Sequence, residues 1–209
     1  FQTFKSENVA TAQTPKAEYS KSTTDVAESH LEMMRKLELP REMHEELIPY
    51  CDERGIMFLS SPFDEESADL LSSMGVAAYK IPSGEITNLP FLTHVARKGK
   101  PMIVSSGMSY LGEVEAAVET IGRAGNDQIV LLHCVSNYPA DPANINLRAM
   151  NTMAGACGLP VGFSDHTEGI EVPIAAVALG ACVVEKHFTL DRGMEGPDHA
   201  ASLEPGELK

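Results

Sequence analysis

The chain has 209 residues, of which 43% are hydrophobic and 22% charged, and its formal net charge is -14 at pH 7. No apolar run approaches the roughly 20 residues of a membrane helix, and there is no cluster of Lys and Arg of the kind that binds a phosphate backbone. The composition therefore argues against a membrane protein and against a nucleic-acid partner, and it favours a soluble globular domain.

Short apolar runs alternate with helical patterns along the chain. The opening FQTF is typical of the end of a strand, and later strands are predicted to begin near Met57, Ala77, Pro101, Gln128, Pro160 and Ala181. Apolar residues at helical spacing, closed by Pro or Gly, predict helices over 24–39, 41–54, 64–74, 88–99, 111–124, 145–156 and 168–179. Residues 10–24, rich in Thr, Ser and Lys, are the one candidate for a long loop.

Three of these helices carry more specific expectations. Val26 is expected in the apolar stripe of the first helix, and Pro49 is expected to kink or split the second. The helix over 168–179 has apolar residues on nearly every face, so we expect it to be well buried.

The spacing of the strands predicts the fold class. Strands that recur every ~20 to 30 residues with helices between them are typical of βα units, so residues 1–209 are expected to form one α/β domain. Six apolar runs each stop on a small polar or chelating residue: MFLSS, AAYKIPSGE, PMIVSSG, QIVLLHC, PVGFSDH and ACVVEKH. In a (β/α)8 TIM barrel such residues meet at the rim that carries catalysis.

The four cysteines, Cys51, Cys134, Cys157 and Cys182, stand singly, without a CxxC pair. Buried free thiols in a reducing compartment are therefore expected rather than disulfides. This expectation places the protein in the cytoplasm.

Two histidines carry the sharpest chemical signal. His166 and His187 are 21 residues apart, and each falls at the end of one of two adjacent predicted strands, so the rings can face each other. Neutral imidazoles in this position suit a divalent ion such as Mn, Zn, Fe or Co, with other coordination positions left to water or substrate. The alternative is two histidines held by hydrogen bonds alone.

Hydroxyl groups and one lysine form a second group at the predicted rim. Lys80 lies inside an apolar strand, where a cation normally needs an anionic partner. The hydroxyls can hold a phosphate or carboxylate, although Ser is also common where a strand meets a helix. They are Ser61, Ser83, Ser105, Ser106, Ser136 and Ser164.

Other polar residues are more ambiguous. Glu85 could act as an acid or base, hold a substrate hydroxyl, or simply start a helix, and Asp198 could bind sugar hydroxyls or be solvated. His30, His44 and His94 lie in helical patterns and are expected to be ordinary surface or boundary residues, while His133 stands undecided at a strand end.

Eight segments in order resemble one enzyme family. They are FQTFK, SSPFDEES, KIPSGE, SSGM, HCVSNYP, GFSDHT, EKHFTLD and GPDHAASLEP. Together they are similar to the barrel domain of the N-acetylneuraminate (sialic acid) synthase family, in its bacterial sialic or legionaminic acid type. The resemblance implies a TIM barrel that here lacks the first strand and most of the second, and a C-terminal antifreeze-like domain absent from this chain. It also implies that the fragment alone is poorly stable and inactive and that the full-length enzyme is a homodimer.

The resemblance implies a transferase reaction between phosphoenolpyruvate and an N-acetylmannosamine-type aldehyde, giving a nine-carbon 2-keto acid and phosphate. His166 and His187 match the ligands of a divalent metal, expected to be Mn2+, with Mg2+ or Co2+ as alternatives. Glu85 matches a carboxylate that handles the water or the intermediate, and Tyr138 and Asp198 match residues on the sugar side. The positions that match phosphoenolpyruvate contacts are Gln2, Ser61, Lys80, Ser83, Ser105, Ser136 and Ser164.

Three alternatives stay open at the level of sequence. One is a different metal-dependent barrel enzyme such as a hydrolase, which normally has more His and Asp ligands. Another is a related phosphoenolpyruvate aldol synthase that uses a different aldehyde. The third is a non-catalytic sugar-binding or scaffold protein, which has no use for the two histidines.

Overall fold

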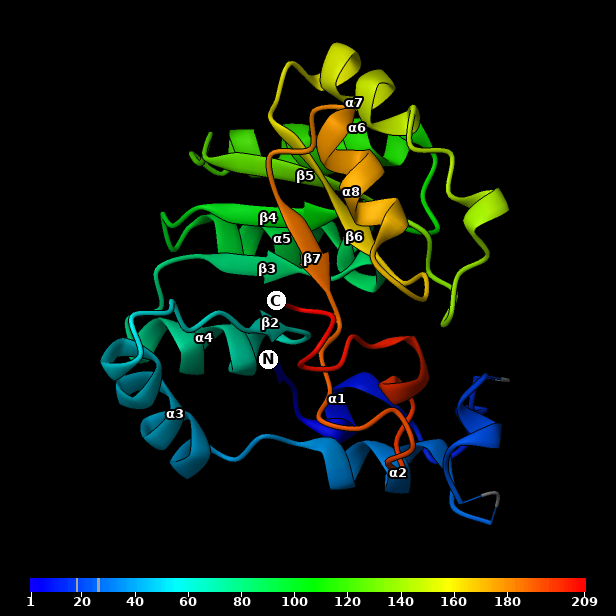
Figure 1. The fold of residues 1–209 in the computed structure, drawn as a ribbon. Helices are drawn as coiled ribbons and strands as arrows, with labels where there is room; N and C mark the ends of the chain where they lie inside the picture. The colour runs from blue at the N-terminus through cyan, green and yellow to red at the C-terminus, as the bar shows by residue number, and fades with distance from the viewer. Residues whose placement is uncertain (18, 26) are drawn as a thin grey trace.

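The computed structural model describes residues 1–17, 19–25 and 27–209, so Val26 lies outside the described residues. Its centre is a curled parallel sheet of five strands in chain order: β3 (Tyr79–Ile81), β4 (Met102–Ser105), β5 (Ile129–Cys134), β6 (Val161–Asp165) and β7 (Val184–Lys186). A separate parallel pair, β1 (Gln2–Thr3) and β2 (Ser61–Pro62), lies beside β3 (Figure 1). The sheet is a parallel half-barrel, and each of its five strands begins one to three residues after its predicted start.

Helices fill the connections between the strands. They are α1 (Ser6–Val9), α2 (His30–Leu37), α3 (Arg41–Glu53), α4 (Glu65–Ser73), α5 (Leu89–Ala96), α6 (Leu111–Arg123), α7 (Ala149–Cys157) and α8 (Glu171–Ala178), with 3-10 turns η1 (Tyr19–Ser22), η2 (Ser83–Glu85), η3 (Pro142–Asn144) and η4 (His199–Ala201). In the described part of the chain, no helix combines the length and the apolarity needed to cross a membrane.

The core lies between the sheet and the helices α4 to α7. Strand residues such as Tyr79, Val104 and Phe163 pack with helix residues such as Leu71 and Ile121, and all five are fully buried. Burial of a side chain of this size contributes about 1.5–3 kcal/mol, so this layer is what holds the strand ends in place.

The helix that contains Val26 in the prediction begins later than expected. Ser29 caps α2, because its hydroxyl accepts the Glu32 N–H while the Glu32 carboxylate accepts the Ser29 N–H. This capping box fixes the helix start at His30. Residues 19–22, inside the predicted loop, form a 3-10 turn instead.

Helix α3 differs from its prediction in two ways. It runs unbroken from Arg41 to Glu53 with Pro49 inside it, so Pro49 does not split the helix, and the kink that was the other expectation stays a prediction. His44, expected at the surface, is fully buried, because its Nε2 meets the Thr3 hydroxyl at 2.8 Å and its Nδ1 meets the Pro40 carbonyl at 2.9 Å. Nε2 thereby ties α3 to β1, and Nδ1 holds the ring against the start of its own helix.

Helix α8 is partly exposed, so the prediction that it is well buried is wrong. Ala176 packs against β6, but Ile174, Val177 and Leu179 are among the exposed large apolar side chains. A helix that is apolar on every face can bury only the side that meets the sheet when a single layer covers it.

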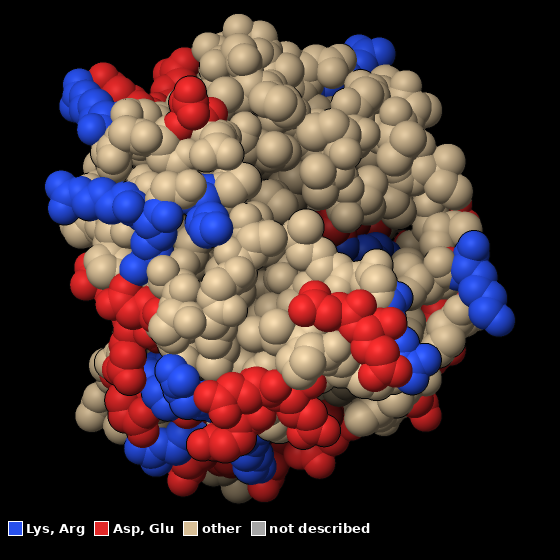
Figure 2. Space-filling model, turned by 90° about the vertical axis from the view of Figure 1, so that its left-hand side faces the viewer, with Lys and Arg blue, Asp and Glu red and all other residues tan. Residues whose placement is uncertain are grey.

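The surface is charged unevenly. On the face seen in Figure 2, acidic side chains gather over the lower part and are interleaved with Lys and Arg, further Lys and Arg project at the upper left, and the upper right is mostly uncharged. Interleaving of both signs satisfies much of the local charge even though the chain as a whole is strongly acidic.

The cysteines are free, as expected, but they are not all buried. Cys51 and Cys134 are buried, Cys157 is partly buried and Cys182 is exposed. Cys182 lies in the short loop between α8 and β7.

Candidate active site

Because the five strands are parallel and adjacent, their carboxyl ends deliver consecutive loops to one rim. The two predicted histidines meet there. The rings of His166, after β6, and His187, after β7, are 5.4 Å apart between centroids and cross at 70°. The Tyr138 ring lies 4.0 Å from that of His166 and 5.5 Å from that of His187. The three rings form one aromatic cluster at the rim.

The loop after β5 fixes the orientation of His166. The Nδ1 atom of His166 lies 2.7 Å from the Val135 carbonyl oxygen, and the Ala140 N–H donates to the His166 carbonyl over 2.8 Å. A carbonyl can only accept, so Nδ1 carries the proton and Nε2 is left with its lone pair. His166 therefore has the tautomer that a metal ligand requires.

The protonation equilibria of the cluster are shifted. Burial disfavours the charged form of His166, but its contact with Cys134 and the Val135 carbonyl raise the pKa above the ordinary value. Burial lowers the pKa of His187, although the Asp198 carboxylate, 3.7 Å from Nδ1, opposes this effect. Burial also opposes ionisation of Cys134, yet its hydrogen bond with His166 leaves the thiol pKa lowered.

The donor set is compatible with a divalent metal. Among the described residues, no group of three or more His, Cys, Asp or Glu side chains is arranged to hold an ion. Two imidazoles on neighbouring strand ends, one with its Nε2 lone pair free by tautomer, would supply two ligands and leave the other positions to water or substrate. His166 and His187 therefore fit an open metal site rather than a closed structural one.

A buried cation lies on the inner face of the sheet. Lys80 is 4% exposed, and its Nζ lies 3.3 Å from Glu185 Oε1 and donates to the Ile81 carbonyl over 3.1 Å. The Ser164 hydroxyl donates to the same Glu185 oxygen over 2.7 Å. The Glu185 carboxylate thus binds both the Lys80 ammonium and the Ser164 hydroxyl. This confirms the expectation that Lys80 has an anionic partner.

The other serines of the rim gather around Gly107. The Gly107 N–H donates to the Ser83 hydroxyl over 3.0 Å, and a Cβ atom at Gly107 would lie only 2.2 Å from the Ser136 hydroxyl. The hydroxyl of Ser105 is buried and has no hydrogen-bond partner within the described chain. A buried hydroxyl without a partner is costly, so it is an observation in favour of a polar ligand at this point.

Of the two predicted sugar-side residues, Asp198 lines a cavity next to His187. This cavity, of about 270 Å³, is lined by Gln2, His187 and Asp198 together with residues of the loops around them. Tyr138 lies beside it in the aromatic cluster and is covered by Tyr19 of η1, at 5.3 Å between ring centroids. Burial and the nearby Asp198 raise the pKa of Tyr19 to about 12.

Four more residues named in the sequence analysis are held by contacts within the protein. Glu85 accepts a hydrogen bond from Asn88 Nδ2 over 2.8 Å, which is the helix-start role that was its alternative. Ser61 opens β2 opposite Gln2, with its N–H donating to the Phe1 carbonyl. Ser106 is held by the Leu132 carbonyl. The ambiguous His133 bonds the Ile145 carbonyl and packs on Phe163, so it is structural.

The sequence interpretation missed three polar residues of this region. Glu185 joins Lys80 to Ser164, and a buried ion pair joins Asp165 to Lys186. Strand alternation could have indicated Glu185, since it stands two positions before His187 and so shares its face. The ion pair depends on the register between β6 and β7, which no local pattern specifies.

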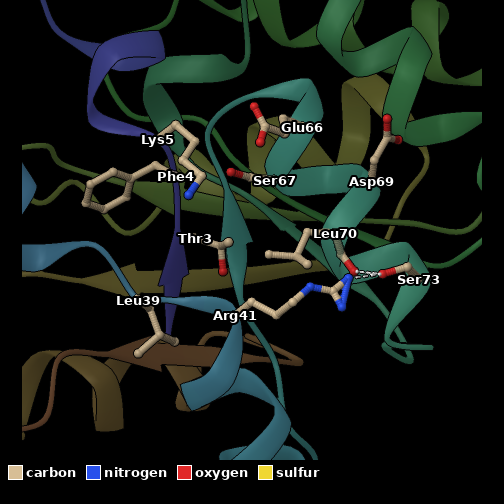
Figure 3. Close-up of a pocket in the computed structure, with 10 residues that line it drawn as sticks. All are labelled: Thr3, Phe4, Lys5, Leu39, Arg41, Glu66, Ser67, Asp69, Leu70 and Ser73. Carbon is tan, nitrogen blue, oxygen red and sulfur yellow. Dashed lines mark hydrogen bonds between the residues drawn. The ribbon is translucent and has the colours of Figure 1, made fainter.

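A second cavity, of about 420 Å³, lies between β1, the start of α3 and α4 (Figure 3). Arg41 in it bonds the Ser73 hydroxyl over 3.4 Å and pairs with Glu45. None of the predicted site residues lines this cavity. The histidines and the serines at 83, 105, 106, 136 and 164 instead lie at or just after the ends of β3 to β7, and Lys80 lies within β3.

Known proteins resemble the chain over its whole length. It is 52% identical over 211 residues to the N,N'-diacetyllegionaminic acid synthase of Campylobacter jejuni, and the match covers 100% of this chain and 63% of that protein. It is 50% identical over 213 residues to the enzyme of the same name from Legionella pneumophila, and that match covers 100% of this chain and 60% of that protein. The human N-acetylneuraminate-9-phosphate synthase is 40% identical over 178 residues, which are 85% of this chain and 49% of that protein.

A solved structure agrees with these relatives. The N-acetylneuraminic acid synthetase of Leptospira borgpetersenii, determined with citrate, matches with a TM-score of 0.87 and 33% identity over 100% of this chain and 68% of that one. The chain spans about three fifths of the length of the two bacterial relatives. The NeuB family matches residues 1–209, and the chain therefore belongs to the NeuB family.

Proposed function

We propose that the complete protein condenses phosphoenolpyruvate with an amino-sugar aldehyde to give a nine-carbon 2-keto acid and phosphate. The observation that carries the proposal is the meeting of His166, His187, Lys80 and the rim serines at adjacent strand ends. A cation and hydroxyls suit a phosphorylated carboxylate, and two imidazoles suit a metal ion.

The residues take the following roles in this proposal. Lys80 and the serines at 61, 83, 105, 136 and 164, with Gln2, bind the phosphate and carboxylate of phosphoenolpyruvate. Glu185 keeps the Lys80 ammonium in place before the substrate arrives. His166 and His187 hold a divalent ion, for which we propose Mn2+; when bound, it supplies Lewis-acid polarisation of the aldehyde oxygen.

The chemistry balances without a redox partner. C3 of phosphoenolpyruvate attacks the aldehyde carbon, water adds at C2, and the intermediate loses phosphate by cleavage of the C–O bond. Asp198 orients the sugar from the cavity beside His187, and Tyr138 does so from its place against the His187 ring. Glu85 handles the water or the intermediate, for which its side chain must leave Asn88.

The sugar favoured is the 2,4-diacetamido-2,4,6-trideoxymannose of legionaminic acid synthesis. The support is the identity of 52% and 50% to two proteins named N,N'-diacetyllegionaminic acid synthases. In the complete protein we propose that the half-barrel is part of a TIM barrel and that the enzyme is a cytoplasmic homodimer.

The test measures phosphate release by the complete protein with Mn2+ and phosphoenolpyruvate, and compares N-acetylmannosamine with the diacetamido sugar. Release is expected with the second sugar and not with buffer alone. His166→Ala and His187→Ala are expected to lower the rate of phosphate release by at least about 100-fold. The control His94→Ala removes a histidine that binds Asp69 on the outer helices, and it is expected to retain this rate. Absence of release with both sugars and metal would overturn the proposal.

A further inference from the structure

A buried ion pair lies directly behind the two histidines. Asp165 Oδ2 and Lys186 Nζ are 2.6 Å apart, and their side chains are 0% and 7% exposed. The two residues are paired across β6 and β7 in the parallel register. Each immediately precedes one histidine, Asp165 before His166 and Lys186 before His187.

The pair also fixes the turn around His166. Asp165 Oδ1 accepts both the Thr167 N–H, over 3.0 Å, and the Thr167 hydroxyl, over 2.8 Å. Lys186 Nζ donates to the Thr167 carbonyl. The residues on both sides of His166 are therefore bound to each other and to the residue before His187.

Strand alternation places this pair on the sheet face opposite the site. Ser164 and Glu185 meet on the inner face, so Asp165 and Lys186, one position later on each strand, face outward and the histidines turn inward again. The ion pair cannot contact a ligand held by the histidines. It can act on that ligand only through the backbone that it fixes.

Such a pair needs a reason to be retained. Removing two charges from water costs several kcal/mol per ion, and well-packed apolar residues often replace a buried pair without loss of stability. A buried pair is most useful where a unique geometry matters more than stability. Resting on the metal site of the proposed function, we propose that Asp165 and Lys186 are positioning residues that set the distance between His166 and His187 and so determine metal affinity.

The test uses the complete protein and Mn2+ itself, with free Mn2+ followed by electron paramagnetic resonance. The double variant Asp165→Asn, Lys186→Met removes both charges, so no unpaired buried charge is left to unfold the protein, and metal-free circular dichroism and Tm check folding. Its Kd for Mn2+ is expected to rise about tenfold or more, since residues behind metal ligands typically contribute 10- to 100-fold. Phosphate release is expected to recover when Mn2+ is raised by the same factor.

Two further variants separate positioning from packing. Lys186→Arg keeps a cation that can donate charge-assisted hydrogen bonds to Asp165 and Thr167, and its Kd for Mn2+ is expected to stay within about twofold of the parent's. Lys98→Met removes an ion pair with Asp69 on the outer helices and is expected to leave the affinity unchanged.

The outcomes distinguish this inference from the proposed function. If the parent binds Mn2+ and the folded double variant binds it equally well, the positioning role is overturned while the proposed function stands. An equal loss of Mn2+ affinity in Lys186→Arg and in the double variant also overturns the positioning role, because the shape of the side chain rather than the ion pair would then set the affinity. If the parent binds no Mn2+ at all, the metal site and the positioning role fall together.

Discussion

At the scale of single residues, Gly107 shows how closely the rim serines approach one another. Its backbone donates to the Ser83 hydroxyl, and the space that a side chain would need is filled by the hydroxyls of Ser83 and Ser136. A side chain at this position must displace two hydroxyls to which we assign the binding of phosphoenolpyruvate.

Gly107→Ala is accordingly expected to raise KM for phosphoenolpyruvate by about tenfold, a loss of about 1.4 kcal/mol of binding, with KM for the sugar much less affected. Its Cβ would lie 2.2 Å from the Ser136 hydroxyl and 2.7 Å from that of Ser83, and both would have to turn away. Steady-state kinetics with each substrate in turn measure the effect. Gly112→Ala is the matched control, because no atom lies within 4 Å of its Cβ position; equal KM values in the two variants would contradict the assignment.

At the scale of elements, α4 and α5 are joined on their outer side by one carboxylate. Asp69 on α4 binds Lys98, just after α5, and His94 on α5 over 2.8 Å. The hydrogen bonds with Lys98 and then with His94 hold the pKa of Asp69 below its usual value of 3.8.

A carboxylate with a depressed pKa stabilises the folded state above its unfolded pKa, and this contribution is lost as the pH falls through the folded value. Asp69→Asn is therefore expected to lower Tm at pH 7 and to lower it progressively less below about pH 3.8. The effect is expected to stay below about 1 kcal/mol because Asp69 is largely exposed. Thermal unfolding against pH measures it, with Glu119→Gln, whose partner Arg123 lies on the same helix, as the control. A loss of Tm that is independent of pH would contradict this account.

At the scale of the whole molecule, a metal at the rim would couple binding to folding. His166 and His187 come from different strand ends, so they meet only in the folded chain. A ligand that binds only the folded state at 100 times its Kd stabilises that state by about 2.7 kcal/mol.

Chelation of the complete protein is expected to lower Tm by about 5 °C or more, and added Mn2+ is expected to restore it. Scanning calorimetry with and without chelator measures the shift. The variant His166→Ala, His187→Ala is expected to show no response to either treatment. A response of the same size in that variant would place the stabilising metal elsewhere.

Sequence patterns alone determined the order of strands and helices, the free thiols and the residues at the rim. These features are local: a run of β-branched residues forms a strand, and a Gly before that run ends the preceding helix, whatever lies elsewhere in the chain. Strand ends could be named because parallel strands all place their carboxyl ends on one side. That is why His166, His187 and Lys80 could be predicted.

Tertiary structure decided which of these residues share partners. Glu185 bonds both Lys80 and Ser164, Asp165 pairs with Lys186, and His44 is buried against Thr3, because strand register and helix packing bring together residues 21 to 105 positions apart in the chain. The exposure of one side of α8 could not be predicted either, since an apolar pattern indicates which side chains a helix can bury and not which elements cover it. Partner choice depends on distances in space, and a sequence records only distances along the chain.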